Sequence, residues 1–337
     1  MQQSNLIKIG LDASGGDYGE IEVCKAVIEV LKLDLDVEFS LYGDYNLIAK
    51  CFNDLNYDYK TKPIKIIDVK EKIGMNDHPV FAIRNKKDSS IVKAGESLRT
   101  KEIDTFISAG NTGALVALSQ FILKPINGID RPVVAAIVPT NNKPMILIDS
   151  GCNVDSKPEW LHQYAKLSDI YYRFMFGEKP RIGLLNVGVE ENKGNALTLM
   201  TYKLLKDDNS FNFIGNVEAR DLVYGVCEIT ITDGFAGNVF LKTYEGTATL
   251  LLKLIKDQIK SSFISTIGGL LIKSKLKKLL SKYDAKIYGG APILGINYLV
   301  LKCHGNSRSL EYIYTIKQAH KLIKKNFISE MSKNFEV

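Results

Sequence analysis

The sequence predicts a three-layer α/β/α fold built on a mostly parallel, doubly wound sheet. Short apolar, β-branched runs recur along the chain, and longer helix-like stretches separate them. This alternation is typical of βαβ units. Runs such as Met145 to Ile148 are apolar at every position, as expected of a strand covered by helices on both faces. We find no internal repeat and no Pro- or Ser-rich linker, and therefore predict a single two-lobed α/β domain over residues 1–337.

The individual elements follow from the spacing of apolar residues. Runs of four to seven apolar and β-branched residues predict strands at 6–11, 37–42, 64–69, 104–108, 133–138, 145–148, 181–187, 211–217, 228–232 and 298–302. Longer stretches with apolar residues at helical spacing predict helices at 21–33, 82–98, 112–123, 158–176, 195–205, 237–259 and 309–325. Such apolar stripes are expected to face the core rather than a cofactor.

Composition excludes several classes of protein. The chain is 45% hydrophobic and 24% charged, close to the average of soluble globular proteins. Its five cysteines are scattered without a CxxC pair, and its four histidines lack metal-ligand spacing, so we expect neither disulfides nor a metal site. The first residues have no charged region followed by a long apolar stretch, so no signal peptide is predicted. We therefore expect a cytoplasmic protein with reduced thiols.

The net charge of +6 is concentrated in one segment. Residues 250–282 contain eight lysines against a single acid, Asp257, so the segment carries +7 and the rest of the chain sums to −1. Nucleic-acid binding is not predicted, and the local basic surface needs another explanation.

One loop has the form of a phosphate site. The stretch Ser108-Ala109-Gly110-Asn111-Thr112-Gly113 ends a predicted strand and opens an apolar helix. Free backbone N–H groups at a helix start attract anions, and glycine lets a ligand approach the backbone. On the motif alone, an ordinary strand-to-helix connection is an equally good interpretation.

The loop after the first predicted strand has a similar composition. It reads Asp12-Ala13-Ser14-Gly15-Gly16-Asp17, and neither GxGxxG nor a Walker A motif is present. Nothing therefore favours NAD or ATP, and no cofactor is predicted. Three later loops, at 186–195, 214–221 and 232–239, also follow strands and carry Gly, Asn and charge. In a parallel sheet such loops gather at the carboxyl ends of the strands, where ligands bind.

Taken in order, the motifs resemble one family, the phosphate acyltransferases of bacterial phospholipid synthesis. The matching stretches run from residue 12 to about 307 and lie at 12–17, 85–90, 108–115, 153–159, 183–188, 193–195, 213–218, 233–238, 288–292 and 304–305. The chain departs from the family at Ser14, at Tyr18-Gly19-Glu20 and at Trp160, which are therefore poor catalytic candidates.

The resemblance implies transfer of a fatty acyl group from an acyl carrier protein thioester to inorganic phosphate. It also implies a fold like those of isocitrate and isopropylmalate dehydrogenases and of phosphate acetyl- and butyryltransferases. A homodimer with a cleft between two lobes is implied as well.

Phosphate can attack a thioester without a protein nucleophile, so the protein must supply positioning and electrostatic stabilisation. We expect residues 108–113 and Lys193 to hold phosphate, Asn195, Asn216 or Asn238 to supply amide donors, and Asp233 to manage a proton. The predicted catalytic residues are Asp233, Lys193 and Asn238, and the predicted substrate-binding residues are Asp12, Gly15, Gly16, Ser108, Gly110, Asn111, Thr112, Gly113, Asn195, Asn216 and His304. The alternatives are a helix cap for Asp233, a solvated charge for Lys193 and a structural role for His304.

Residues 245–285 predict a protruding amphipathic helical hairpin. Lysines flank an uncharged window, Ser261 to Ile272, which is shorter than the ~20 residues of a membrane span. We expect Ile267, Leu270, Leu271 and Ile272 to contact an anionic membrane peripherally, near the membrane-bound glycerol-3-phosphate acyltransferase that uses the product in the resembling family. Dimerisation through the apolar stripe, with lysines facing solvent or the acidic carrier protein, is the alternative.

Two other functions remain open from the sequence. One is a short-chain phosphate acetyl- or butyryltransferase that uses coenzyme A. The other is a non-catalytic membrane-associated scaffold that keeps the fold.

Overall fold

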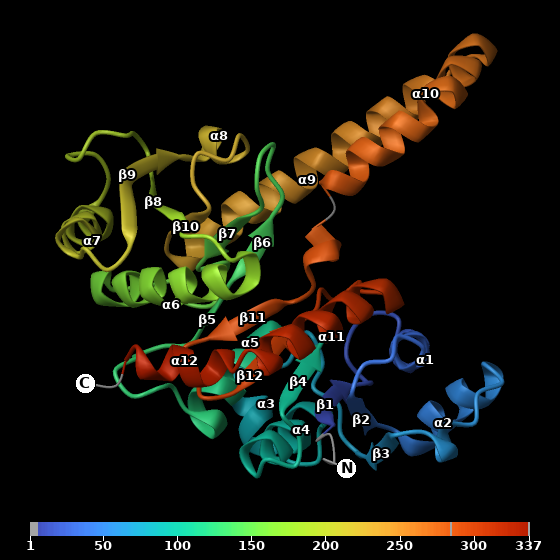
Figure 1. Ribbon diagram of the computed structural model, residues 1–337. Helices are drawn as coiled ribbons and strands as arrows, with labels where there is room; N and C mark the ends of the chain where they lie inside the picture. Colours follow the sequence, from blue (N-terminus) through green and yellow to red (C-terminus); the bar gives the residue numbers. More distant parts are fainter. Residues whose placement is uncertain (1–5, 284, 336–337) are drawn as a thin grey trace. The chain divides into compact units, whose positions relative to one another are not determined.

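The computed structural model describes residues 6–283 and 285–335, which form two compact units (Figure 1). The first unit comprises the residues up to Ala136, Lys166–Lys179, and the residues from Lys286 onward. The second comprises Ile137–Ala165 and Pro180–Ala285. Each unit has its own sheet.

The first unit contains a seven-stranded sheet in the order β3-β2-β1-β4-β12-β11-β5. The strands are β1 (Ile7–Asp12), β2 (Val37–Gly43), β3 (Ile64–Asp68), β4 (Thr105–Ser108), β5 (Val133–Val134), β11 (Ala291–Leu294) and β12 (Leu299–Lys302). All neighbours are parallel except β11, which is antiparallel to β12 and β5. Since β4 lies between β1 and β12 and is parallel to both, these three strands end at the same edge of the sheet.

Helices cover this sheet and bury its apolar side chains. The helices of the first unit are α1 (Glu20–Leu31), α2 (Tyr45–Asp54), α3 (Pro79–Asn85), α4 (Ser90–Arg99), α5 (Thr112–Leu118), α11 (Ser309–Lys324) and α12 (Phe327–Lys333), with short segments η1 (Tyr59–Thr61), η2 (Ser119–Leu123) and η3 (Ala285–Tyr288). Ile9, Phe106 and Leu301 are fully buried in the middle of the sheet. Helix α6 (Pro158–Phe176) belongs to the second unit up to Ala165 and to the first unit from Lys166.

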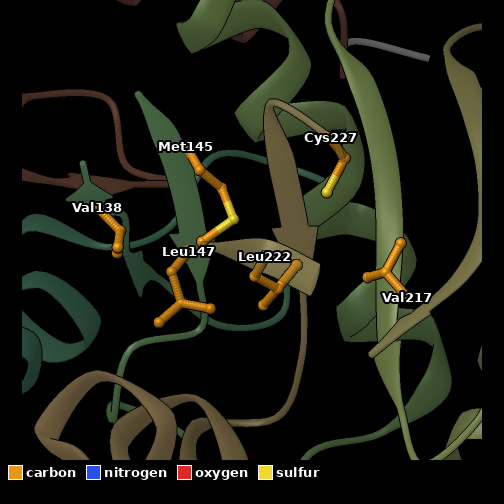
Figure 2. Close-up of a cluster of buried hydrophobic side chains, with 6 residues drawn as sticks. All are labelled: Val138, Met145, Leu147, Val217, Leu222 and Cys227. Carbon is orange, nitrogen blue, oxygen red and sulfur yellow. The ribbon is translucent and has the colours of Figure 1, made fainter. Parts of the chain in front are cut away.

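The second unit contains a five-stranded sheet in the order β6-β7-β10-β8-β9. Its elements are β6 (Ala136–Val138), β7 (Met145–Ile148), β8 (Arg181–Asn186), β9 (Asn212–Glu218) and β10 (Ile229–Ile231), with helices α7 (Ala196–Asp207), α8 (Ala219–Leu222), α9 (Gly234–Ile259) and α10 (Phe263–Lys282). Strands β7, β10, β8 and β9 are parallel. Figure 2 shows the buried cluster on this sheet, formed by Val138, Met145, Leu147, Val217, Leu222 and Cys227.

Helices α9 and α10 run side by side and extend away from the five-stranded sheet (Figure 1). Ile259 packs so closely on Gly269 that a Cβ added there would lie 2.3 Å from the Ile259 Cγ2 atom. The turn between the helices lies at residues 260–262, where the Ser262 side chain accepts a hydrogen bond from the backbone N–H of Ser265. Gly268 and Gly269 therefore lie within α10. Over residues 6–283 and 285–335, no helix combines the length and the hydropathy that a membrane span requires.

The parallel-dominated α/β architecture predicted from the sequence is confirmed, but it contains two sheets instead of one. The predicted strand 133–138 is divided into β5 and β6, and each half joins a different sheet. The predicted helix 82–98 is likewise divided into α3 and α4 around Lys86, whose carbonyl accepts from the Ser89 hydroxyl at 2.7 Å. Strand β11 was not predicted, and its Pro292 lowers the strand signal.

Two glycines in α9 give a matched test of packing. A Cβ at Gly237 would lie 1.9 Å from the Asp149 carbonyl oxygen, whereas a Cβ at Gly246 would meet nothing within 4 Å. Gly237→Ala should therefore lower the free energy of unfolding by about 1–3 kcal/mol because the backbone must move. Gly246→Ala should raise it by roughly 0.5–1 kcal/mol because alanine is the better helix former. Denaturant titration of both variants checks this, and a Gly237→Ala protein as stable as the wild type would contradict the packing described.

Candidate functional site

The site residues predicted from the sequence fall into two groups, one in each unit. Nine lie in the first unit, at the ends of β1, β4 and β12: Asp12, Gly15, Gly16, Ser108, Gly110, Asn111, Thr112, Gly113 and His304. Five lie in the second unit, near the ends of β8, β9 and β10: Lys193, Asn195, Asn216, Asp233 and Asn238.

In the first unit, Asp12 and Ser108 form a buried pair at the ends of adjacent strands. The Ser108 hydroxyl donates to the Asp12 carboxylate at 2.6 Å, and both residues are essentially inaccessible to solvent. Burial raises the pKa of Asp12 above its ordinary value, although hydrogen bonds from Ser108 and Ser90 and the charge of Lys72 act in the opposite direction. The Ser108 oxygen also accepts from the Gly110 N–H at 2.9 Å, which fixes the turn after β4.

Glycine is required where the three loops meet. A Cβ at Gly15 would lie 2.5 Å from an Asp12 carboxylate oxygen and 2.8 Å from the Gly110 nitrogen. Gly16 has a φ of +80°, and a Cβ there would lie 2.9 Å from the Gly305 carbonyl oxygen. The N–H of Asp17 donates to that same carbonyl at 2.8 Å. The loops after β1, β4 and β12 are thus packed backbone against backbone, which only residues without a Cβ allow at these positions.

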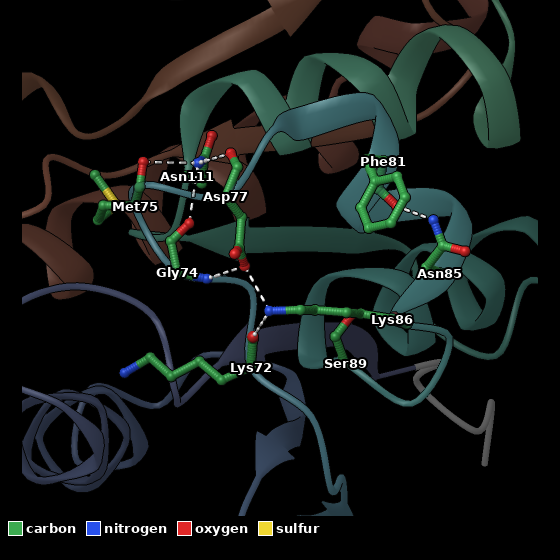
Figure 3. Close-up of polar contacts among 9 residues, drawn as sticks. All are labelled: Lys72, Gly74, Met75, Asp77, Phe81, Asn85, Lys86, Ser89 and Asn111. Carbon is green, nitrogen blue, oxygen red and sulfur yellow. Dashed lines mark hydrogen bonds and ion pairs between the residues drawn. The ribbon is translucent and has the colours of Figure 1, made fainter.

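Asn111 connects the start of α5 to a segment that was not predicted to take part. Its side-chain oxygen accepts from the Ala114 N–H at 3.0 Å and caps the helix. Its side-chain amide donates to the carbonyls of Gly74 and Met75 at 3.1 and 3.2 Å (Figure 3). Helix α5 begins at Thr112, and Gly113 lies against Pro79, where a Cβ would approach to 2.5 Å.

Lys86 holds the same segment from the other side. Its ammonium group lies 2.6 Å from the Asp77 carboxylate and donates to the Lys72 carbonyl at 2.9 Å. The Gly74 N–H also donates to the Asp77 carboxylate, at 2.8 Å. Lys86, followed by this N–H, lowers the pKa of Asp77. Figure 3 shows the Lys72 side chain pointing away from this pair, so its charge is not used there.

His304 follows β12 and is exposed. Its carbonyl accepts from the Ser307 N–H at 3.0 Å, which shapes the turn that presents Gly305 to Gly16. The backbone around His304 therefore belongs to the loop cluster.

In the second unit, Asp233 is the N-cap of α9. Its carboxylate accepts from the Ala236 N–H at 2.8 Å, and the side chain is half-buried. This is the helix-cap role that the sequence left open beside catalysis. Asp233 also lines a cavity of about 1040 Å³, so the carboxylate is available to a ligand held there.

The loop that carries Lys193 is fixed by its neighbours. The side-chain amide of Asn186 donates to the Lys193 carbonyl at 3.0 Å. Gly194 adopts a φ of +106°, and a Cβ added there would clash with the Thr198 side chain. Asn195 caps α7 by accepting from the Thr198 N–H at 3.0 Å. Lys193 is exposed, and Gly194 and Asn195 line the same cavity as Asp233.

Asn216 and Asn238 occupy different environments. Asn216 is buried, and its amide donates to the Glu190 carbonyl at 2.8 Å, which ties β9 to the loop after β8. Asn238 is exposed on the second turn of α9 and lies beside Gly151, whose added Cβ would approach its Cγ to 3.2 Å. The Asn216 side chain thus holds the loop after β8 against β9, while the Asn238 side chain faces the loop after β7.

Asp149, at the end of β7, was not singled out in the sequence. Its buried carboxylate accepts four hydrogen bonds of 2.7–2.9 Å, from the backbone N–H groups of Gly151, Cys152 and Asn153 and from the Asn153 side chain. Burial still raises its pKa above the ordinary value. The Gly234 N–H donates to the Asn153 carbonyl, so Asp149 indirectly positions the first turn of α9. The position of Asp149 directly after an apolar strand is the sequence signal that could have indicated this role.

The cavity in the second unit lies along α9 from Phe235 to Leu251. Its α9 wall consists of Phe235, Ala236, Val239, Phe240, Thr243, Tyr244, Thr247, Ala248 and Leu251. The remaining lining residues are Leu161, Leu184, Leu185, Asn186, Val187, Gly194, Asn195, Thr198, Ala219, Arg220, Val223, Thr232 and Asp233. We call this space the α9 cavity.

The buried cysteines do not offer an activated nucleophile. Burial raises the pKa values of the Cys227 and Cys303 thiols to about 11, so little thiolate is present at neutral pH.

Comparison with known proteins yields a family over nearly the whole chain. Residues 7–330 match the family described as fatty acid synthesis protein. The chain is 44% identical over 332 residues to a phosphate acyltransferase of Clostridium botulinum (strain Alaska E43 / Type E3), covering 98% of this chain and 99% of that protein. It is also 44% identical over 320 residues to a phosphate acyltransferase of Dictyoglomus turgidum, covering 94% of each. A solved phosphotransacetylase from Streptococcus pyogenes shares the fold, with a TM-score of 0.61, 15% identity and 95% coverage of both chains.

The buried Asp12 carboxyl generates a pH-dependent prediction. Its pKa in the folded protein is raised above 3.8, so the folded state holds this proton more tightly than the unfolded state. The associated stabilisation is complete at acid pH and is lost as pH rises through the raised pKa. Asp12→Asn keeps an acceptor for Ser108 but cannot ionise. Its melting temperature should exceed that of the wild type near pH 8, and the difference should vanish toward about pH 4.

Thermal melts across this pH range measure the difference. Asp17→Asn, which changes an exposed acid in the same loop, is the matched control and should follow the wild type. An Asp12→Asn protein that is less stable than the wild type near pH 8 would show that the buried carboxylate stabilises the fold.

Proposed function

This chain belongs to the phosphate acyltransferase family, and we propose that it transfers a long-chain fatty acyl group from acyl carrier protein to inorganic phosphate. The chain is therefore an acyltransferase, with phosphate as the acyl acceptor consistent with the family. The acyl phosphate product would enter phospholipid synthesis.

The observation that carries this proposal is the packing of the loops after β1, β4 and β12. Gly15, Gly16 and Gly110 place no side chains where these loops meet, and α5 begins at Thr112, directly after the turn that follows β4. The first backbone N–H groups of a helix attract anions. Burial raises the pKa of Asp12, which lies beneath the same loops. We assign the binding of inorganic phosphate to this cluster.

The proposed reaction needs no covalent enzyme intermediate. A phosphate oxygen attacks the thioester carbonyl carbon, the carbon–sulfur bond breaks, and the sulfur leaves as a thiolate that takes up a proton. The protein contributes orientation of the phosphate and stabilisation of the negative charge that develops on the carbonyl oxygen. In the second unit we propose Lys193 as the cation for that charge, and Asn195 or Asn238 as amide donors.

We propose Asp233 as the group that handles the proton. The Asp233 Oδ1 atom accepts the capping hydrogen bond from the Ala236 N–H, and the residue lines the α9 cavity. A helix N-terminus stabilises a carboxylate, which suits a group that orients monohydrogen phosphate or the departing sulfur.

We further propose that the protein acts as a homodimer that contacts an anionic membrane peripherally through α10. Leu270 and Leu271 are 64% and 79% exposed, and Phe263 and Ile264, nearer the turn, are 81% and 82% exposed. Lysines follow this apolar stretch from Lys273 onward. Apolar side chains flanked by lysines suit a helix lying in a lipid headgroup region. Such contact would bring the acyl phosphate near the membrane-bound glycerol-3-phosphate acyltransferase that the family resemblance implies.

Turnover separates the proposed function from its rivals. Hexadecanoyl carrier protein with labelled phosphate should give an acid-labile acyl phosphate, at a rate well above those for acetyl- and butyryl-coenzyme A. Preference for the short coenzyme A thioesters would establish the short-chain activity instead. No product from any donor would favour a non-catalytic scaffold.

Lys193→Ala and Asp233→Asn should each lower the rate of acyl phosphate formation at least about tenfold, because each removes transition-state stabilisation. Lys203→Ala and Asp207→Asn change exposed residues on the neighbouring helix α7 and serve as matched controls. Steady-state rates and unchanged melting temperatures check the prediction. Near-normal turnover in both Lys193→Ala and Asp233→Asn would remove these residues from the reaction.

The membrane proposal predicts a loss of lipid binding when charge is placed on α10. Leu270→Glu/Ile272→Glu should abolish flotation with anionic liposomes, because buried carboxylates oppose insertion and like charges repel. Asn53→Glu/Thr61→Glu adds the same charge to exposed positions of the first unit and should float like the wild type. Equal flotation of all three proteins would mean that this part of α10 does not enter the lipid.

A further inference from the structure

We propose that the α9 cavity binds the hydrocarbon tail of the acyl substrate and sets the longest chain that the protein accepts. This inference rests on the proposed function, in that it identifies where a long-chain substrate would place its tail. It is carried by the chemistry of the lining, the length of the cavity along α9, and the contacts that occupy its polar groups.

The lining of the cavity changes in character along its length. Near the start of α9 it contains Asp233, Asn186 and Asn195, which can interact with a polar group. Farther along α9, the wall is formed by Phe240, Tyr244, Ala248 and Leu251 at three- and four-residue spacing. Val223 and Ala219 contribute apolar surface from the segment after β9. A ligand with a polar head and a long apolar tail matches this order.

Two polar side chains of the lining, Tyr244 and Arg220, have partners within the second unit. The Tyr244 hydroxyl donates to the Pro139 carbonyl at 2.8 Å, so this residue presents mainly its ring. Arg220, the cationic member of the lining residues, lies 2.6 Å from the Glu218 carboxylate. Arg220 is the only cation among these described lining residues, so the lining offers little to a nucleotide or another polyanion, whereas a hydrocarbon needs no cation.

The dimensions also fit an acyl chain. Phe235 and Leu251 lie sixteen residues apart on α9, which corresponds to roughly 24 Å along the helix axis. One leaflet of a bilayer, whose thickness is set by its acyl chains, is about 15 Å of hydrocarbon, half of the usual core thickness. The volume of about 1040 Å³ lies at the upper end of the range for small-molecule sites. Phe235 and Val239 are 63% and 53% exposed, so a bound chain would cover apolar surface that is now open.

Binding of a fluorescent hexadecanoic acid, measured without phosphate or carrier protein, tests the proposal directly. Ala248→Trp places a ring in the apolar half of the cavity, whereas Thr249→Trp places the same ring on the face of α9 that does not line it. Because each displaced methylene weakens binding by roughly fourfold, loss of two should weaken it by about fifteenfold in Ala248→Trp. Thr249→Trp should bind like the wild type.

Turnover of octanoyl and hexadecanoyl thioesters provides the second readout. Ala248→Trp should retain the octanoyl rate and lose the hexadecanoyl rate selectively. Wild-type binding and a wild-type rate ratio in Ala248→Trp, or no binding of hexadecanoic acid by the wild type, would overturn the proposal. If Ala248→Trp changed only the oligomeric mass of the protein, the proposal would also be overturned. The face around Ala248 would then be assigned to contact with a second copy of the chain. Binding as expected without any acyl phosphate formation would instead refute the proposed reaction and leave the cavity assignment intact.

Discussion

Close approach of three backbones at one edge of the seven-stranded sheet is the constraint on which the proposed chemistry depends. Strands β1, β4 and β12 are adjacent and parallel, so the loops that follow them must share a small space. Gly15 fits beside Gly110, and Gly16 fits beside Gly305, only because no Cβ is present. The Asp12–Ser108 pair lies beneath the loops and orients the Gly110 N–H. We propose that a small anion such as phosphate binds where these loops meet and α5 begins.

Hydrogen bonds and an ion pair from neighbouring segments hold these loops in place. Asn111 caps α5 and also holds the carbonyls of Gly74 and Met75, while Lys86 anchors Asp77 in the same segment. In the second unit, the Asp149 carboxylate accepts from the Asn153 N–H, and the Asn186 side chain donates to the Lys193 carbonyl. These hydrogen bonds hold the loops around Asn153 and Lys193. Preorganised donors cost little reorganisation when charge develops during a reaction, which is the main advantage of such a framework for acyl transfer.

Local patterns in the sequence predicted much of the fold and part of the site. The strand Met145–Ile148 and the helix Pro158–Phe176 have the predicted bounds, and the loops after β1 and β4 meet as expected for parallel neighbours. What could not be predicted depends on contacts between distant residues. The division of 133–138 between two sheets leaves no trace in an uninterrupted apolar run. The link from Asn111 to Gly74 spans 37 residues, and no periodicity reveals it. The role of Asp149 could not be predicted, because a single acid after a strand is common. Its four hydrogen bonds come from the turn that it organises.

Calorimetric titration of inorganic phosphate into the protein tests the phosphate site most directly, because it requires neither an acyl donor nor turnover. The wild type should bind phosphate, and Gly15→Ala should weaken binding by at least about tenfold, because its methyl group would force the loops after β1 and β4 apart. Gly268→Ala, which adds a methyl group in open space, should titrate like the wild type. Absence of phosphate binding by the wild type, or equal affinity in Gly15→Ala, would contradict a pocket of backbone N–H groups at the ends of β1, β4 and β12.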